Sequence, residues 1–291
     1  MKLTKLLVTG MLGMGLVFSG AFTAVPSPVV FAEVANNAES VTADGYGAFN
    51  PRMPLGQAKI MARRAAIVDA QRNLVEQIQG AQIDAETTME MAMATSDTVK
   101  TKVSGVIRGA KIIAESIEKD GNYKVTLSVP TYGVGSVAQV AYDALSEAGK
   151  MPATPAPIAK PDQSFKQTYT PAGSAYTGVI VDARGMELSP TFAPAIYDVN
   201  GRVIYGVRNV DKDYAIVHGL VEYTTDESMV QRAVTGGARA GSNPLIIKAV
   251  STKTRIANKC DVVVSVEDAN KILAENERTG FLEKYAVVLE K

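Results

Sequence analysis

The chain is poor in the two residue types on which much enzyme chemistry depends. Its 291 residues include one cysteine, Cys260, and one histidine, His218. A single cysteine cannot form an intramolecular disulfide, so stability must come from packing. The two residues together cannot form a cluster of zinc ligands. We therefore expect neither a disulfide framework nor a metal site, and no cofactor.

The chain also lacks an excess of charge of either sign, with 30 basic and 30 acidic residues. Removing Lys2 and Lys5 with the signal described below leaves 28 basic against 30 acidic residues, a formal charge of −2. This near-neutral balance argues against nucleic acid and against anionic lipid held by a general basic field. After the N-terminal run, no segment reaches the roughly 18 apolar residues that a membrane span needs.

The N-terminus has the order of a secretory signal. Lys2 and Lys5 precede an apolar run over residues 6–24, and Val30-Phe31-Ala32 follows. A charged region, an apolar region and a small-residue cleavage site predict a signal peptide over residues 1–32. If it were not cleaved, the run would be long enough to cross a bilayer once, which leaves an anchored periplasmic protein as the alternative.

Export narrows the classes of function. Chemistry driven by ATP or nicotinamide becomes improbable outside the cytoplasm, which leaves binding, envelope assembly or cofactor-free hydrolysis. Cys260 lies far from the signal, so no thiol is placed to carry a lipid. We expect an exported protein without lipid, in the periplasm or associated with the outer membrane.

A proline-rich stretch over residues 150–175 divides the rest of the chain. It has no apolar periodicity, which is typical of a semi-rigid linker. On this basis residues 40–149 and 176–291 form two modules. Its prolines are Pro152, Pro155, Pro157, Pro161 and Pro171.

Each module is expected to be α+β, an antiparallel or mixed sheet with helices on one face. The first module should contain a helix over 55–79, a short strand near 83–87, a helix begun by Ser96 or Asp97, two strands joined at 120–122 and a helix over 137–148. In the second module we expect a two-residue type I′ hairpin around Asn200-Gly201. We also expect helices over 227–234 and from Ser265 to about residue 278. The expected strands are 179–181, 214–223, 245–252, 262–264 and 285–289.

Few residues indicate chemistry. His218 and Cys260 could act as base and nucleophile, but a strand histidine and an unrelated buried thiol are the more probable interpretation. Loops at 182–190 and 235–244 could form the mouth of a ligand site. The candidates for loop contacts are Asp182, Arg184, Glu187, Arg239 and Asn243.

Residues 62–130 resemble a family of exported bacterial envelope proteins. The matching features are the alanine-rich helix at 62–74, Val106-Ile107-Arg108-Gly109-Ala110, and the closing segments 121–125 and 129–130. The family includes a small conserved outer-membrane lipoprotein and the flagellar accessory proteins P and T. Its members are non-enzymatic, and the flagellar ones help to build rings or disks around the motor. The lipoprotein members carry an acylated cysteine after the signal, which this chain lacks.

The second module is similar to a companion domain in exported proteins of unknown function, through residues 177–185, 198–201, 243–245 and 281–284. The two resemblances imply a non-catalytic envelope protein, with association with the flagellum as its specific case, that assembles with itself or with envelope or flagellar proteins through open sheet edges and linker-spaced modules. The alternative is a soluble periplasmic module that binds a small ligand or glycan. An enzyme ranks third.

Overall fold

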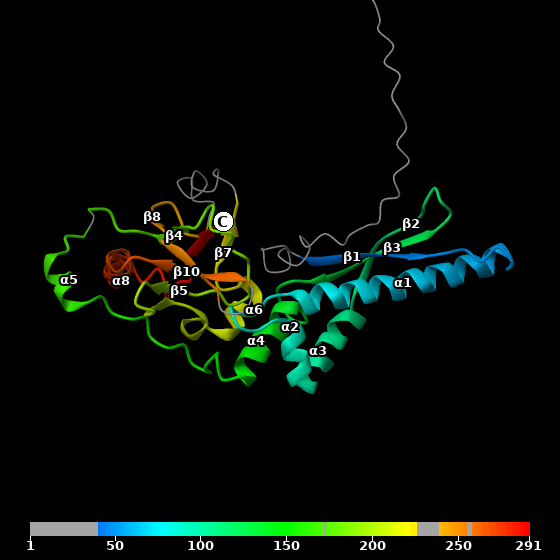
Figure 1. Cartoon of the computed structure of the whole chain (residues 1–291), viewed down its shortest axis with the longest axis horizontal. Coiled ribbons are helices and arrows are strands. Elements are labelled where there is room, and N and C mark those ends of the chain that lie inside the picture. Colours follow the sequence, from blue (N-terminus) through cyan, green and yellow to red (C-terminus); the bar gives the residue numbers. More distant parts are fainter. Residues whose placement is uncertain (1–39, 172, 226–238, 255–257) are drawn as a thin grey trace, which may run out of the picture.

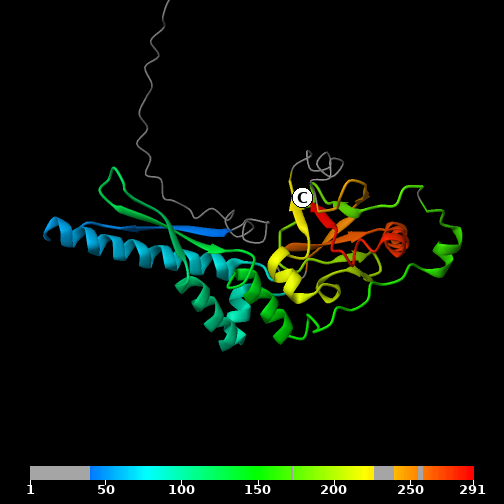
Figure 2. The ribbon, with the colours of Figure 1, turned by 180° about the vertical axis from the view of Figure 1, so that it is seen from behind.

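The computed structural model describes residues 40–171, 173–225, 239–254 and 258–291. The predicted signal peptide and the helix predicted at 227–234 lie outside these residues. The molecule is elongated, with the N-terminal module projecting from the C-terminal one (Figures 1 and 2). Of the helices in the described part, none combines the length and apolarity needed to cross a bilayer.

The N-terminal module is a three-stranded antiparallel sheet, in the order β1-β3-β2, with its helices on one side (Figure 1). Its elements are β1 (Ser40–Gly47), α1 (Leu55–Gly80), α2 (Met89–Thr95), α3 (Asp97–Arg108), β2 (Lys111–Ile117), β3 (Tyr123–Pro130) and α4 (Val137–Glu147). The predicted helices at 55–79 and 137–148 are confirmed. So is the start of α3, where the Ser96 hydroxyl accepts a hydrogen bond from the Val99 amide.

Helix α1 packs unusually close to the sheet. Its buried stripe recurs every fourth residue and begins with Ala58, Ala62, Ala66 and Ala70. Opposite them, a Cβ atom on Gly45 would lie 2.7 Å from the Ala70 Cα, with backbone atoms closer still. The lack of a side chain at Gly45 and the small methyl side chains of the facing alanines are therefore what allows this distance.

Two differences from the sequence-based expectation concern strands in this module. The strand predicted near 83–87 is a tight turn with one isolated bridge, between Gln82 and Thr88. Strand β1 was not predicted. Its buried positions are Val41, Ala43, Gly45 and Gly47, so small residues replace the apolar alternation by which strands are detected.

The C-terminal module contains two four-stranded sheets. Its elements are β4 (Gly178–Asp182), β5 (Ile196–Asp198), β6 (Val203–Tyr205), the 3₁₀ turn η2 (Val207–Asn209), α6 (Lys212–His218), β7 (Glu222–Thr224), β8 (Pro244–Lys248), β9 (Ser251–Thr254), β10 (Lys259–Val264), α8 (Val266–Thr279) and β11 (Val287–Glu290). One sheet, β6-β5-β10-β9, is mixed, and the other, β7-β11-β4-β8, is parallel throughout. The α+β class holds for both modules.

Local signals placed several of these elements correctly. Ser265 caps α8 by accepting a hydrogen bond from the Asp268 amide, and Gly280 ends it in the left-handed conformation. The hairpin of β5 and β6 is also present, but its turn is not type I′. Asp198 and Arg202 enclose a three-residue loop, and only Gly201 has a positive φ, of 85°. This is a type I turn followed by a glycine bulge.

The strand predicted at 214–223 is wrong. Residues 212–218 form helix α6, because the Asp211 carboxylate caps its first turn at the Tyr214 amide, and only residues 222–224 are extended. A short apolar run does not separate helix from strand by its pattern alone. The strand predicted at 245–252 is two strands, β8 and β9, which belong to different sheets.

The two modules share a buried junction. The Tyr142 hydroxyl of α4 donates a 2.8 Å hydrogen bond to the Phe192 carbonyl, and the Phe192 ring lies edge-on to Tyr132 and Tyr142. The Ala193 amide donates to the Ile83 carbonyl at 2.8 Å. One continuous core therefore extends through both modules.

The proline-rich segment does not hold the modules apart. It runs along the C-terminal module and includes helix α5 (Gln163–Thr168) (Figure 1). The Asp162 carboxylate binds Arg202 at 3.0 Å, and the Tyr169 hydroxyl donates to Glu275 at 2.7 Å. The segment is thus a strap on one module, and the expected assembly through linker-spaced modules does not fit this arrangement.

Candidate functional site

The predicted loop residues do not converge on one mouth. In the parallel pair of β4 and β8, Gly178 lies opposite Pro244 and Asp182 opposite Lys248. The loop at 182–190 follows the carboxyl end of β4, whereas Asn243 lies at the amino end, beside Thr177. Opposite ends of a five-residue strand are about 13 Å apart. Residues 235–238 of the second predicted loop lie outside the described residues, but Asp182 and Asn243 lie at opposite ends of the strand pair and do not share one mouth.

Asp182 and Arg184 form a local ion pair at the end of β4. Arg184 donates to both carboxylate oxygens of Asp182, at 2.9 and 2.8 Å, and lies 3.6 Å from buried Glu290. The bonds from Arg184 outweigh the effect of partial burial and lower the pKa of Asp182. Glu187 pairs with Lys259 at 2.6 Å on the surface. These contacts stabilise a strand end and leave neither carboxylate poised for proton transfer.

Arg239 also has a structural role. Its guanidinium donates to the His218 and Gly219 carbonyls, at 3.2 and 2.8 Å, and lies over the Tyr214 ring. The carbonyls at the end of α6 lack helical partners, so a cation there satisfies them and meets the negative end of the helix dipole. Asn243 bonds the Ala175 carbonyl and the Thr177 hydroxyl.

The His218 and Cys260 pair has no catalytic geometry. Cys260 is fully buried in β10, and burial raises its pKa to about 12, so the thiol stays protonated. His218 ends α6 and packs on the Tyr214 ring. No hydrogen bond joins the two among the described residues. Across those same ranges, no group of three or more acidic, histidine or cysteine side chains is arranged to hold a metal ion.

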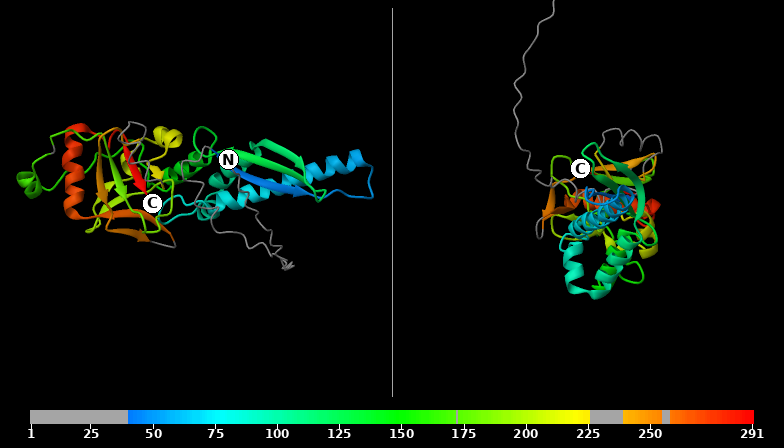
Figure 3. Two further views of the ribbon diagram at one scale, coloured as in Figure 1. Left: turned by 90° about the horizontal axis from the view of Figure 1, so that it is seen from above. Right: turned by 90° about the vertical axis from the view of Figure 1, so that its right-hand side faces the viewer.

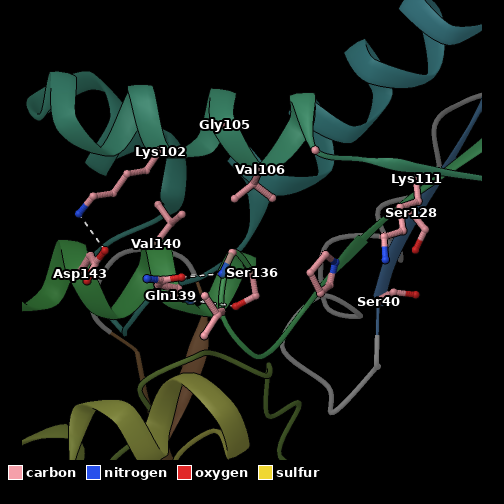
Figure 4. A pocket seen from close by; sticks show the side chains of 14 residues that line it. Ser40, Lys102, Gly105, Val106, Lys111, Ser128, Ser136, Gln139, Val140 and Asp143 are labelled. Carbon is pink, nitrogen blue, oxygen red and sulfur yellow. Dashed lines mark hydrogen bonds and ion pairs between the residues drawn. The ribbon is translucent and has the colours of Figure 1, made fainter.

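An open cleft of about 740 Å³ lies between α3, α4 and the base of the sheet (Figure 4). Lys102 and Asp143 form its charged end with a 2.8 Å ion pair, and Val106 and Val140 line its middle. Asp143 also binds Lys212 of α6 at 2.6 Å. The ionic groups at this end are therefore joined to each other, while Ser40, Lys111 and Ser128 line another part of the cleft.

The sheet of the N-terminal module presents an exposed apolar edge. Strand β2 is solvent-exposed along its whole length, including Ile112, Ile113 and Ile117, of which Ile113 is 58% and Ile117 is 55% exposed. Because β2 runs antiparallel to α1, Ile117 lies toward Ile60, which is 56% exposed. We call these four isoleucines the arm edge. Both β2 and α1 belong to the N-terminal module, which projects from the C-terminal one (Figure 3).

An ionic contact secures this exposed strand to α1. Arg63 donates to both carboxylate oxygens of Glu115, at 2.9 and 2.6 Å, and the Tyr123 hydroxyl donates to the same group at 2.6 Å. The bonds from Arg63 and then from Tyr123 lower the pKa of Glu115 to about 2. The arm edge is therefore held in place although few of its side chains are buried.

The lowered pKa of Glu115 predicts that the stability of the protein depends on pH through this contact. A carboxyl whose pKa falls on folding stabilises the fold above its ordinary pKa of 4.5, and this stabilisation is lost as the pH falls toward about 2. We expect the melting temperature of the native chain to exceed that of E115Q at about pH 6 and to approach it near about pH 2. Melting curves of both proteins at the two pH values test this. A difference that does not change with pH would contradict it.

Sequence analysis located the strands that form this edge but not their exposure. The run Ile112-Ile113 reads as a buried strand, because adjacent apolar residues on both faces are typical of burial. A register shift between Ile112 and Ala114 changes which side chains face α1. No local signal in the sequence indicates that β2 is left uncovered by the elements in the described part of the chain.

Comparison with known proteins agrees with the two-module organisation. A family model of the LPP20 lipoprotein matches residues 49–129, from just before α1 to the end of β3. A family model of the second domain of Treponema pallidum Tp0624 matches residues 178–289, from β4 to β11. The curated proteins yielded no match. The chain thus joins an LPP20-lipoprotein-like module to a module like the second domain of Tp0624, the organisation of an exported envelope protein.

Proposed function

We propose that the protein is a non-catalytic component of the bacterial envelope that assembles with copies of itself or with a larger complex through its N-terminal module. The observation that carries the proposal is the arm edge. Three exposed isoleucines lie on the edge strand β2, and the ion pair between Arg63 and Glu115 holds this strand beside α1, which carries the fourth. Contiguous exposed apolar surface on a folded protein usually marks an interaction site.

The irregular pairing of β2 favours a partner that contacts the side chains of the arm edge over a partner that adds another strand to the sheet. A bulge interrupts the pairing of β2 with β3 between Ile112 and Ala114. Bulges at edge strands limit uncontrolled strand-to-strand association. A partner that covers the isoleucines from the α1 side would bury them without needing a regular ladder.

A non-catalytic role is supported by the groups that would otherwise suggest chemistry. The thiol of Cys260 is buried and protonated, and Arg239, Asp182 and Arg184 are used in structural contacts. The flagellar accessory proteins that the first module resembles make assembly around the flagellar motor the specific case to test. Crosslinking in intact cells, followed by identification of the attached proteins, tests that case.

The arm edge itself is tested by reversing its apolar character. We expect the double variant I113K/I117K to weaken self-association by about a hundredfold or more, since each buried isoleucine is worth about 1.5 kcal/mol or more. Sedimentation across a range of concentrations measures this, and capture of partners from envelope extracts is compared in parallel.

The control is I246K, which places a single lysine on an exposed isoleucine of another edge strand, β8, and is compared with the single variants I113K and I117K. This variant should associate like the native chain. A native protein that is monomeric at every concentration and captures no envelope component would refute the proposal. Equal weakening in I246K would place the contact elsewhere.

A further inference from the structure

A second surface of the N-terminal module differs from the arm edge in its chemistry. A groove of about 730 Å³ runs between α1 and α3. Half-buried Val75 and buried Ile107 lie in its floor, while Gln71, Thr101 and Ser104 add polar groups. We call this surface the α1–α3 groove.

The rim of the groove is basic. Arg72 of α1 and Lys100 and Arg108 of α3 are all exposed and line it, against one acidic lining residue, Asp97. Arg72 and Lys100 have no side-chain partner among the described residues, and Arg108 donates only to the Ser104 carbonyl, at 3.2 Å. Elsewhere in the module, Arg63, Lys102 and Lys124 are paired with carboxylates.

We propose that the α1–α3 groove binds an acidic amphipathic segment of a partner protein. The apolar floor requires an occupant with an apolar side, and the three cations on the rim require carboxylates beside it. A helical segment that lies between α1 and α3 can present apolar side chains and carboxylates side by side, because residues three and four positions apart are neighbours on a helix surface. The inference rests on the proposed assembly role and names the class of partner for a surface other than the arm edge.

The shape of the site favours a polypeptide over a lipid surface. Val75 and Ile107 come from the two helices that line the groove, so an occupant that contacts both must lie along the line between α1 and α3. The chain as a whole is also close to neutral, so it has no general attraction for an anionic membrane. A segment that enters the groove can use the charges and the floor together.

The test uses a fluorescently labelled synthetic helix with leucine on one face and glutamate on the other, titrated with the full chain purified after export. We expect saturable binding that weakens with added salt, as screening predicts. The triple variant R72E/K100E/R108E should bind at least about tenfold more weakly, because each attraction becomes a repulsion. The variant V75S should weaken binding with every charge retained.

The matched control is R64E, which reverses an exposed arginine two turns earlier on α1 that does not line the groove. It should bind like the native chain. Equal loss in R64E, undiminished binding by the triple variant, or no binding of the helix would overturn the inference. Binding of polyglutamate as tightly as the amphipathic helix would also overturn it, since the floor would then have no role.

Anionic phospholipid vesicles provide the remaining arm of the test. If the native chain binds them in preference to the helix, the groove recognises a lipid surface and the inference is wrong. Circular dichroism of each variant confirms that it is folded. The oligomer measurements on I113K/I117K use different residues, so failure of this inference and failure of the assembly role are distinguishable.

Discussion

Replacing Gly45 with alanine is expected to destabilise the N-terminal module by about 3 kcal/mol or more, at the upper end of the cost of overpacking. The added Cβ would meet backbone atoms of α1, including the Ala70 Cα at 2.7 Å. Backbone cannot rotate away as a long side chain can, so the helix and the sheet must separate. Urea unfolding followed by circular dichroism measures the change.

Gly105 provides the control with the opposite sign. It lies within α3, and a Cβ there would meet no atom within 4 Å. The variant G105A should therefore stabilise the protein by roughly 0.5–1 kcal/mol through helix propensity alone. If G45A were as stable as the native chain, the close approach of α1 to the sheet would be wrong.

Truncating Phe192 is expected to have an effect of similar size, but on both modules together. The ring is 1% exposed at the junction, and replacing a buried phenylalanine with alanine costs about 3–5 kcal/mol. For a chain of this size, the loss corresponds to a fall in melting temperature of about 10 °C. Because the core is continuous through the junction, we expect a single transition that shifts as a whole.

Calorimetry of F192A tests this against F165A, which removes a half-buried ring from α5 that stacks on Tyr169. The control should change the melting temperature much less. Two separate transitions in the native protein, of which F192A moves only one, would show that the junction does not couple the modules.

Local sequence signals identified much of the secondary structure. Serine caps at Ser96 and Ser265, the left-handed Gly280 and the four-residue recurrence in α1 each act within one or two turns of chain. Where a short apolar run fitted both a helix and a strand, the residues around it decided which of the two formed. The apolar run around Ile216 became a helix because Asp211 caps its first turn and its buried residues face the junction.

The candidate sites were harder to foresee. Arg239 and Asn243 stood out as loop residues, yet each has partners that are distant in sequence, His218 and Ala175 among them. The basic rim of the α1–α3 groove comes from Arg72 and Lys100, which are separated by 28 positions. In the sequence, each of these two residues looks like an ordinary solvent-exposed charged residue.

The sequence by itself determined the exported class, the α+β character of both modules and the limits of most helices, because these depend on composition and on contacts between near neighbours. Only the tertiary structure decided that the modules share a core, that the proline-rich segment is a strap and that, among the elements the structure describes, none covers β2. Those features depend on which surfaces meet after the chain has folded back on itself. The contact of Tyr142 with Phe192, for example, joins residues that are distant in sequence, and it produces no periodic pattern in the residues between them.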